Sequence, residues 1–271
     1  MNNIVVYTCI TNNYDWLLPP LWTSPNVLYI CFSDNPNLTC KGWEVLPLPV
    51  LPGLGNGNLA NRFCKFFPWK ILPEHHWSLY VDAHIRLLSD PSPVIADIET
   101  SGYHMAIPVH PHRSNIWEEV DACIRFKKFK PEDQLQVQDQ LDRYKRDGLV
   151  RDSGLTENGI IIRSGNHDVL EPMMQLWWYE FLSGVKRDQI SLPYVLSKKR
   201  TEIYRLPFSS RDNNPYFRIV PHRNQGSAVN YLAARQYHGL HWSFAFHAYR
   251  IASGVLRRLR RGFALVFGYA R

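Results

Sequence analysis

Short apolar runs, each ended by polar or turn-forming residues, constrain the fold of this chain more than any other feature. The runs 3–10 and 26–33 are rich in β-branched and aromatic residues, which predicts buried strands. The run 43–49 contains prolines and predicts an edge strand, while the run 78–88, SLYVDAHIRLL, predicts a strand that ends near Asp82. Strands joined by crossovers predict a mostly parallel sheet that binds ligands at the carboxyl ends of its strands.

The same alternation of strands and helices continues along the chain. Further strands are predicted over 103–110 and 158–164, and helices over 59–72, 114–126, 131–148, 167–184 and 187–199. Ser114 is a predicted helix N-cap and Gly184 a predicted helix stop. We expect a single α/β domain over residues 1–221, with a mostly parallel central sheet flanked by helices, and an extension over residues 222–271.

Composition and cysteine content indicate a compact intracellular protein. Hydrophobic residues make up 45% of the sequence and aromatic residues 13%, which is enough for a packed core. The first residues lack the basic start and apolar stretch of a signal peptide, and no run of about 18 apolar residues predicts a membrane span. The five cysteines include no CxxC pair, which favours reduced thiols. We therefore expect a cytoplasmic location.

Basic charge is concentrated at the end of the chain. The net charge is +7, yet no acidic residue follows Asp212, whereas nine arginines do. Over residues 242–267, aliphatic and aromatic residues recur every three or four positions beside four clustered arginines. Such a basic helix suits the surface of an anionic membrane, and a helix packed on the core with a solvated basic face explains the pattern equally well. No recognition motif accompanies the arginines, so we expect no nucleic-acid partner.

Asp82 is the first candidate functional residue, because it directly follows the apolar residues LYV. A carboxylate at the rim of a buried sheet needs a partner, and a metal ion that bridges the phosphates of a nucleotide-sugar would supply it. If the chain stays extended, the side chain of His84 points the same way, so that the two residues form a DxH metal motif. The alternative is a turn cap at Asp82 and a surface histidine at His84.

Two cations precede this motif. Arg62 and Lys65 are three positions apart within a predicted helix and therefore lie on one face. They are placed to pair with a pyrophosphate whose metal ion is bound at Asp82. The alternative is a solvated helix face.

Four segments, in their order along the chain, resemble a family of GT-A-like glycosyltransferases of mostly undefined specificity. Members of this family occur in bacterial polysaccharide loci and among plant Golgi proteins linked to wall and mucilage polymers. These segments are YTCITNNYD (7–15), ICFSD (30–34), NRFCKFFPWKILP (61–73) and SLYVDAHI (78–85). The similarity continues in consistent order to about residue 200. The resemblance implies a GT-A fold, a nucleotide-sugar donor and a divalent metal ion.

The resemblance also implies roles for single residues. The donor-binding residues that it implies are Tyr7, Thr8, Asp34, Arg62, Lys65, Asp82 and Gln189. Tyr7 and Thr8 correspond to the positions that hold the base and ribose. His84 stands where the family's DxD motif has its second aspartate; imidazole coordinates Mn²⁺ but is a poor ligand for Mg²⁺, so manganese is the favoured metal.

Two polar segments are candidates for the chemistry of transfer. Glu157, with Asn158, lies in a turn before a strand, where a glutamate binds an acceptor hydroxyl or acts as the base of an inverting reaction; the alternative is a structural turn at 158–159. Asp188, in the RDQ segment, resembles the acid that GT-A enzymes place beside the transferred sugar. Its alternative role is helix capping.

Histidines complete the set of candidates. His110, His112 and Arg113 are predicted to line the acceptor or phosphate side of the site, or else to form a solvated loop. His222 is predicted as a third metal ligand after Asp82 and His84, with His238, His241 and His247 as competitors. Trp177 and Trp178 are predicted to pack within a helix rather than to stack on sugars.

These observations predict an enzyme that moves a sugar from a nucleoside-diphosphate sugar to a hydroxyl of a surface glycan or lipid-linked saccharide. The tail would hold it peripherally at a membrane. The alternative is a non-catalytic protein of the same fold that binds glycans or anionic lipids. The third hypothesis is a metal-dependent hydrolase that uses Asp82 and the histidines. The sequence has no second carboxylate at a suitable spacing for it.

Overall fold

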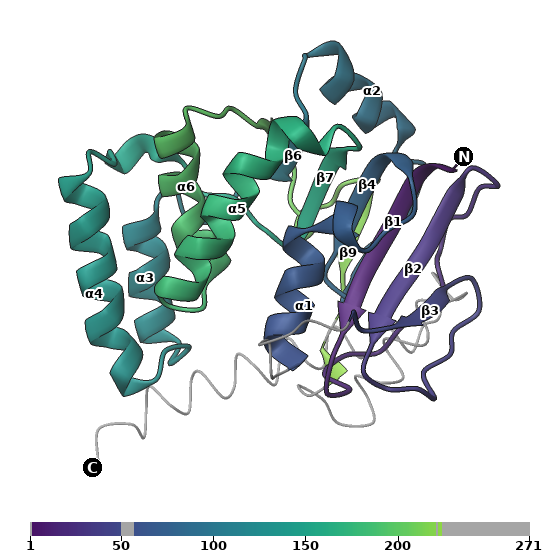
Figure 1. Ribbon diagram of the computed structural model, residues 1–271, viewed down its shortest axis with the longest axis horizontal. Coiled ribbons are helices and arrows are strands. Elements are labelled where there is room, and N and C mark those ends of the chain that lie inside the picture. Colours follow the sequence, from purple (N-terminus) through teal and green to yellow (C-terminus); the bar gives the residue numbers. More distant parts are fainter. Residues whose placement is uncertain (1, 50–56, 221, 224–271) are drawn as a thin grey trace. The chain divides into compact units, whose positions relative to one another are not determined.

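A seven-stranded sheet forms the centre of the computed structural model, which describes residues 2–49, 57–220 and 222–223 (Figure 1). The strand order is β3-β2-β1-β4-β7-β6-β8. The strands are β1 (Asn2–Ile10), β2 (Val27–Ser33), β3 (Glu44–Pro47), β4 (His75–Val81), β6 (Met105–Pro108), β7 (Ile160–Ser164) and β8 (Tyr204–Leu206). The predicted α/β fold with a mostly parallel sheet is confirmed, and β3 lies at the sheet edge as its prolines predict.

One strand departs from the parallel pattern. β7 pairs antiparallel with β4 on one side and with β6 on the other, whereas β1, β2, β3 and β4 pair in parallel, as do β6 and β8. Because β7 runs against β4, its first residues lie beside the last residues of β4, and Val81 pairs with Ile160. The turn before β7 is thereby brought to Asp82.

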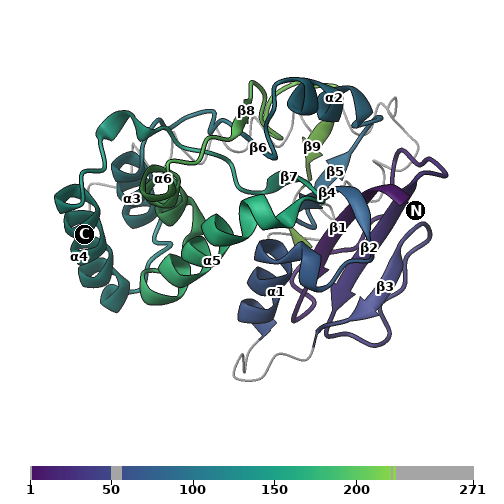
Figure 2. The same ribbon diagram turned by 45° about the horizontal axis from the view of Figure 1, so that its top comes forward.

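A small antiparallel sheet and six α-helices complete the described structure. The sheet consists of β5 (Ile85–Leu87) and β9 (Phe217–Ile219). The helices are α1 (Gly57–Phe66), α2 (Ser92–Thr100), α3 (Ile116–Arg125), α4 (Pro131–Arg146), α5 (His167–Ser183) and α6 (Asp188–Lys199), with short 3₁₀ turns at Pro68–Lys70 and Arg151–Ser153. α3, α4 and α6 gather beside α5, on the side of the molecule away from β3 (Figures 1 and 2).

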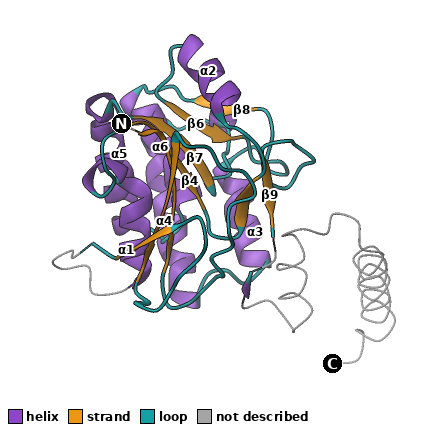
Figure 3. Ribbon diagram, turned by 90° about the vertical axis from the view of Figure 1, so that its right-hand side faces the viewer, coloured by secondary structure: helices purple, strands orange, loops and turns teal. Residues whose placement is uncertain are grey.

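Two hydrophobic clusters cover the two faces of the central sheet. Alternate residues of β1 divide between them: Val5 and Tyr7 pack with α1 and α5, whereas Ile4 and Val6 pack with α2 and β9. In agreement, β9 lies on the opposite side of the sheet from α5 and α6 (Figure 3). This division follows from the two-residue repeat of a strand, and it decides which side chains of β1 can reach the candidate site.

The structure corrects two local predictions. The helix predicted over 59–72 ends at Phe66, because Pro68 forces the preceding residue, Phe67, out of the helical region (φ −125°, ψ 62°). Asn115, rather than Ser114, caps α3, since its side chain accepts a hydrogen bond from the backbone of Glu118. Gly184 ends α5 as predicted.

Part of the prediction lies outside the described residues. Residues 1–224 form one compact unit; the predicted helix over 242–267, with the histidines at 238, 241 and 247, falls beyond the described part. The domain boundary predicted after residue 221 stays a prediction. Within the described residues, no helix combines the length and apolar character needed to cross a membrane. None of the five cysteines forms a disulfide.

Candidate functional site

Asp82 is held at the carboxyl end of β4 by contacts with the start of β7. Its backbone N–H donates to the carbonyl of Gly159 (2.8 Å), and its Oδ1 accepts a hydrogen bond from the Tyr80 hydroxyl (2.8 Å). A Cβ atom at Gly159 would lie 3.1 Å from Asp82 Oδ2. The absence of a side chain at position 159 therefore lets the chain approach the carboxylate closely.

Arg62 and Lys65 meet Asp188 beside this carboxylate. Lys65 is buried, and its ammonium group donates to Asp188 Oδ2, while Arg62 Nη1 lies 3.8 Å from the same oxygen. The Lys65 ammonium also lies 5.3 Å from the ring centre of Tyr80. The two predicted donor-binding cations and the predicted catalytic acid thus share one site.

The electrostatics of this site keep Asp188 ionised. Burial by itself raises the pKa of Asp188, but the cations Lys65 and then Arg62 outweigh it and lower the pKa to about 2. Burial lowers the pKa of Lys65, and the charges of Asp188 and Asp82 oppose that effect. Asp188 is the first residue of α6 and binds cations with its carboxylate, while Arg187 occupies the N-cap position. Helix capping is therefore not its role.

His84 and His222 come together with a carboxylate that the sequence pattern did not indicate, Asp15. The Nδ1 atom of His222 lies 2.9 Å from Asp15 Oδ2, Nδ1 of His84 lies 4.0 Å from it, and the ring centres of the two histidines are 3.8 Å apart. One ligand atom from each of the three residues lies within 4.8 Å of the others. The polar turn TNNYD after the first strand was the only available signal for Asp15.

The pairing of Asp82 with His84 as a DxH metal motif stays a prediction, and the backbone between the two residues differs from the extended strand that it assumes. The chain turns after β4, with the Ile85 N–H donating to the Asp82 carbonyl (2.7 Å), so the two side chains do not follow the alternation of an extended strand. Asp82 is not one of the three clustered ligands within the described residues. The charge of Asp82 still acts on both groups of residues. Burial lowers the pKa of Lys65 beside Asp188 and the pKa of His84 in the cluster, and the Asp82 charge opposes this effect in both cases.

The Asp15, His84 and His222 cluster fits a divalent transition metal. Nδ1 of His84 is buried and has no hydrogen-bond partner in the described structure, so a coordinating atom faces the cluster unsatisfied. Burial is the largest influence on the pKa of His84 and lowers it, which favours the neutral imidazole that binds metals. One carboxylate with two imidazoles suits Mn²⁺ or Zn²⁺ better than Mg²⁺.

Residues 52–214 match the family model described as TOD1/MUCI70, glycosyltransferase-like domain. The chain belongs to this family. A relative, alkaline ceramidase TOD1 of Arabidopsis thaliana, is 26% identical over 224 residues, which cover 71% of this chain and 48% of the relative. The chain thus spans about half the length of that curated relative. Among solved structures, mouse xyloside xylosyltransferase 1 in its apo form is similar with a TM-score of 0.42 and 9% identity, covering 75% of this chain and 84% of that one.

The TOD1/MUCI70 match divides the candidate residues into two groups. Arg62, Lys65, Asp82 and Asp188 lie inside the matched segment, together with His84. Asp15 and His222 lie outside it, one before its start and the other after its end. The Lys65–Asp188 ion pair and Asp82 are therefore parts of the TOD1/MUCI70 domain. The cluster of Asp15, His84 and His222 joins that domain to flanking segments.

The structure corrects the predicted nucleotide contact of Tyr7. This tyrosine is fully buried, its hydroxyl lies 3.5 Å from the Lys65 carbonyl, and its ring meets that of Tyr80 edge-on at 5.4 Å. β1 continues three residues further, to Ile10, so Tyr7 is not at its end. Thr8 is buried on the opposite face and lines a cavity described below. Asp34 is exposed, and both its oxygens accept from the backbone N–H of Asn12 (3.1 and 2.8 Å).

The carboxylate of Glu157 is held by hydrogen bonds within the protein. It accepts them from three neighbours: Ser209 Oγ (2.6 Å), the backbone of Ser210 (3.1 Å) and Arg211 Nε (2.8 Å). These donors occupy both oxygens, which argues against the predicted role as a base. The polar side chains next to it are also hydrogen-bonded within the protein. Asn158 Oδ1 accepts from Thr156 Oγ1 (2.6 Å), and Gln189 Nε2 donates to the Thr156 carbonyl (3.1 Å).

A buried glutamate, which the sequence reasoning missed, organises the predicted phosphate side. Glu119 is 1% exposed and contacts Arg113 Nε (2.6 Å) and Arg187 Nη2 (3.1 Å). His110 is buried, and its Nδ1 accepts backbone hydrogen bonds from His112 (3.2 Å) and Arg113 (3.0 Å), whereas the side chain of His112 is exposed. Burial foremost, and then Arg113, lowers the pKa of His110 to about 4.

The tryptophan pair packs as predicted. Trp177 is fully buried in α5, and its Nε1–H donates to the backbone carbonyl of Asp188 (3.1 Å). Trp178 packs against Phe66, with ring centres 5.4 Å apart. Trp177 therefore fixes the start of α6 and with it the position of the Asp188 carboxylate.

Proposed function

We propose that this chain transfers a sugar from a nucleoside-diphosphate sugar to a hydroxyl of a surface glycan or lipid-linked saccharide. The observation that carries the proposal is the convergence of Arg62, Lys65 and Asp188 beside Asp82 within a glycosyltransferase-like domain. Two cations beside two carboxylates suit a reaction in which a diphosphate leaves and positive charge develops on the sugar.

The cations would stabilise the leaving diphosphate. Lys65 and Arg62 approach the same oxygen of Asp188, so phosphate oxygens of a donor would share these cations with that carboxylate. Asp188 would then lie next to the diphosphate and face the transferred sugar, where an ionised carboxylate stabilises an oxocarbenium-like transition state. Asp82, oriented by the Tyr80 hydroxyl, would complete the donor side.

Asp15, His84 and His222 would hold a divalent metal ion, with manganese favoured. When bound, such an ion supplies positive charge that neutralises the diphosphate. The protein's own contribution is to bring a carboxylate and two neutral imidazoles from separate segments to within 4.8 Å of one another.

A donor screen tests the proposal. Calorimetry with UDP-, GDP-, CMP- and dTDP-sugars, with and without Mn²⁺, should identify one donor class whose binding is lost in Lys65→Met. Lys70→Met is the matched control, because Lys70 is an exposed lysine in the same stretch of chain. If no donor binds, or if Lys65→Met binds the donor as tightly as the wild type, the proposal is wrong, and a non-catalytic glycan- or lipid-binding protein becomes the better explanation.

A second function has one observation in its favour. The Arabidopsis relative is named a ceramidase, and a carboxylate with two histidines is a ligand set that also serves hydrolytic metal sites. Fluorescent ceramide incubated with the Mn²⁺- or Zn²⁺-loaded protein at alkaline pH would reveal amide hydrolysis by release of the fatty acid. Release that disappears in His84→Ala, together with no sugar transfer, would favour this function over the first.

The proposed location is the cytoplasmic face of an anionic membrane, and only the basic sequence over 242–267 supports it. Co-sedimentation with phosphatidylserine vesicles should fall when Arg257, Arg258, Arg260 and Arg261 are all replaced by Gln. Equal binding to neutral vesicles would contradict it.

A further inference from the structure

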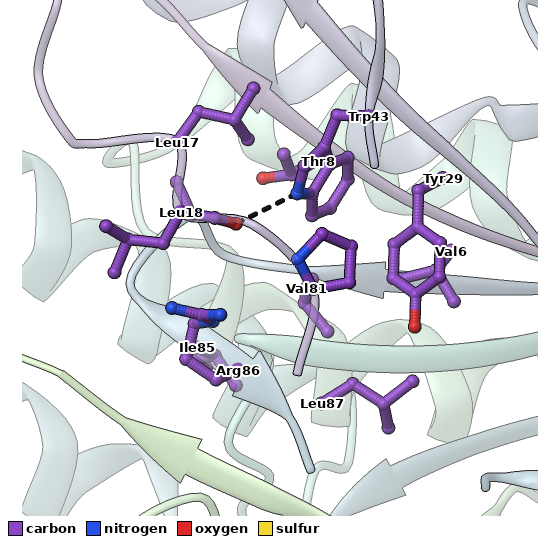
Figure 4. A pocket seen from close by; sticks show the side chains of 12 residues that line it. Val6, Thr8, Leu17, Leu18, Tyr29, Trp43, Val81, Ile85, Arg86 and Leu87 are labelled. Atoms are coloured by element: carbon purple, nitrogen blue, oxygen red, sulfur yellow. Dashed lines mark hydrogen bonds between the residues drawn. The ribbon is translucent and has the colours of Figure 1, made fainter. Parts of the chain in front are cut away.

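A largely enclosed cavity lies behind the turn that follows β4 (Figure 4). Its volume is about 20 Å³, counted as the space that the centre of a water molecule can occupy. Its walls come from β1, β2, β5 and the last residue of β4, from Trp43, and from Leu17, Leu18 and Pro20. Ala83, between Asp82 and His84, is also part of the wall. A volume of this size accommodates one or two water-sized occupants and excludes a phosphate or a sugar.

A buried cation lines this cavity. Arg86, in β5, is only 4% exposed. Its Nη2 donates to the carbonyl of Pro19, but Nη1 has no hydrogen-bond partner in the described structure. Within the described residues, no carboxylate forms an ion pair with it. Guanidinium groups keep their charge at all physiological pH values, so burial without an anion is costly.

A second unsatisfied donor lines the same cavity. The Oγ1 atom of Thr8 is buried and has no hydrogen-bond partner in the described structure. The other walls are mainly apolar, with Leu17, Leu18 and Tyr29 among them. Trp43 closes one side, and its Nε1–H donates to the carbonyl of Leu18 (2.9 Å) rather than into the cavity. Two residues with unpaired hydrogen-bond donors, one of them positively charged, thus line a small space with mainly apolar walls.

We propose that this cavity binds a monatomic halide of the size of chloride, held by the Arg86 guanidinium and the Thr8 hydroxyl. A halide matches all three properties of the site: it is small, it accepts hydrogen bonds from both donors, and it neutralises the buried charge. A water molecule would satisfy the two donors but not the charge. The cavity is not lined by Arg62, Lys65, Asp82 or Asp188, and Thr8, which the family resemblance assigns to the donor, is buried in its wall. The proposal does not depend on the reaction.

Anomalous scattering gives a direct test on the wild-type protein. Crystals soaked in bromide should show an anomalous peak between Arg86 and Thr8. Thermal unfolding in chloride, compared with gluconate at equal ionic strength, should show a midpoint higher by roughly 3–5 °C at chloride concentrations about tenfold above the dissociation constant.

Variants separate halide binding from a general effect of salt. Arg86→Met removes the charge and keeps an unbranched apolar chain, and Thr8→Val keeps the size of the side chain without the hydroxyl. Both should abolish or weaken the difference between chloride and gluconate, whereas the exposed Arg125→Met should leave it unchanged. If Arg86→Met does not fold, Thr8→Val and the bromide peak still decide the matter. A cavity without anomalous density, or a midpoint that is equal in chloride and gluconate, would overturn the proposal in favour of bound water.

Discussion

Lys65 and Asp188 form a buried ion pair although 123 positions separate them in the chain. α1 carries the lysine and α6 begins with the aspartate, and the Trp177 indole fixes the backbone of the aspartate from a third helix, α5. The pair therefore joins elements from distant parts of the sequence at the end of β4. Its two charges are prearranged without a ligand, as expected for a site that stabilises charge electrostatically.

Removal of one partner of this pair should strongly destabilise the fold. Lys65→Met leaves a buried carboxylate whose nearest remaining cation is Arg62, 3.8 Å away, and we expect a loss of about 3 kcal/mol in the free energy of unfolding. The double variant Lys65→Met/Asp188→Leu should recover a large part of that loss. Urea denaturation of the two single variants and the double variant measures the coupling, and additive losses would contradict the pairing.

Stability should fall between pH 6.5 and pH 4 because of His110. Its pKa in the folded protein is about 4, below the ordinary value of 6.5, so the unfolded chain takes up the proton first as the pH falls. The contribution is fully present above pH 6.5 and is lost progressively down to pH 4, by about 2–3 kcal/mol. Urea denaturation at several pH values should show a smaller loss in His110→Asn, whose side chain can still accept the two backbone hydrogen bonds. Parallel curves would refute this assignment.

Asp15 should contribute to metal affinity as strongly as the two histidines. Asp15→Asn, His84→Ala and His222→Ala should each weaken Mn²⁺ binding at least tenfold, since each removes one of three ligands. Isothermal titration calorimetry measures the affinity, and His76→Ala is the control because this histidine is exposed and outside the cluster. If Asp82→Asn weakens Mn²⁺ binding more than Asp15→Asn does, Asp82 rather than Asp15 is the carboxylate ligand, and the proposed metal site is wrong.

Asp82 should be needed for transfer but not for folding. Asp82→Asn keeps the size of the side chain and its contact with Tyr80, and we expect kcat/KM to fall at least about 100-fold with an unchanged Tm. Gly159→Ala should also lower activity, because its Cβ would lie 3.1 Å from Asp82 Oδ2. Asp97→Asn, on the exposed face of α2, is the control. Wild-type transfer rates in Asp82→Asn would remove this residue from the site.

Local pattern was sufficient for much of the fold and for the residues that one element carries. Short apolar runs rich in β-branched residues predicted the strands, the spacing of Arg62 and Lys65 placed both on one face of a helix, and the end of an apolar run placed Asp82 at a sheet rim. Each of these properties depends on neighbours within a few positions. The sequence therefore determined them without knowledge of the partner elements.

Only the tertiary structure decided which of these residues meet. His222 joins Asp15 across 207 positions, β7 enters the sheet antiparallel, and Tyr7 is buried between α1 and β4. A repeat determines the face on which a side chain lies but not the element that covers that face. For the same reason, the sequence pattern allows Glu157 to act as a base, whereas the fold places three hydrogen-bond donors from residues 209–211 on its carboxylate. Contacts between distant segments depend on the packing of the whole sheet, which no local pattern contains.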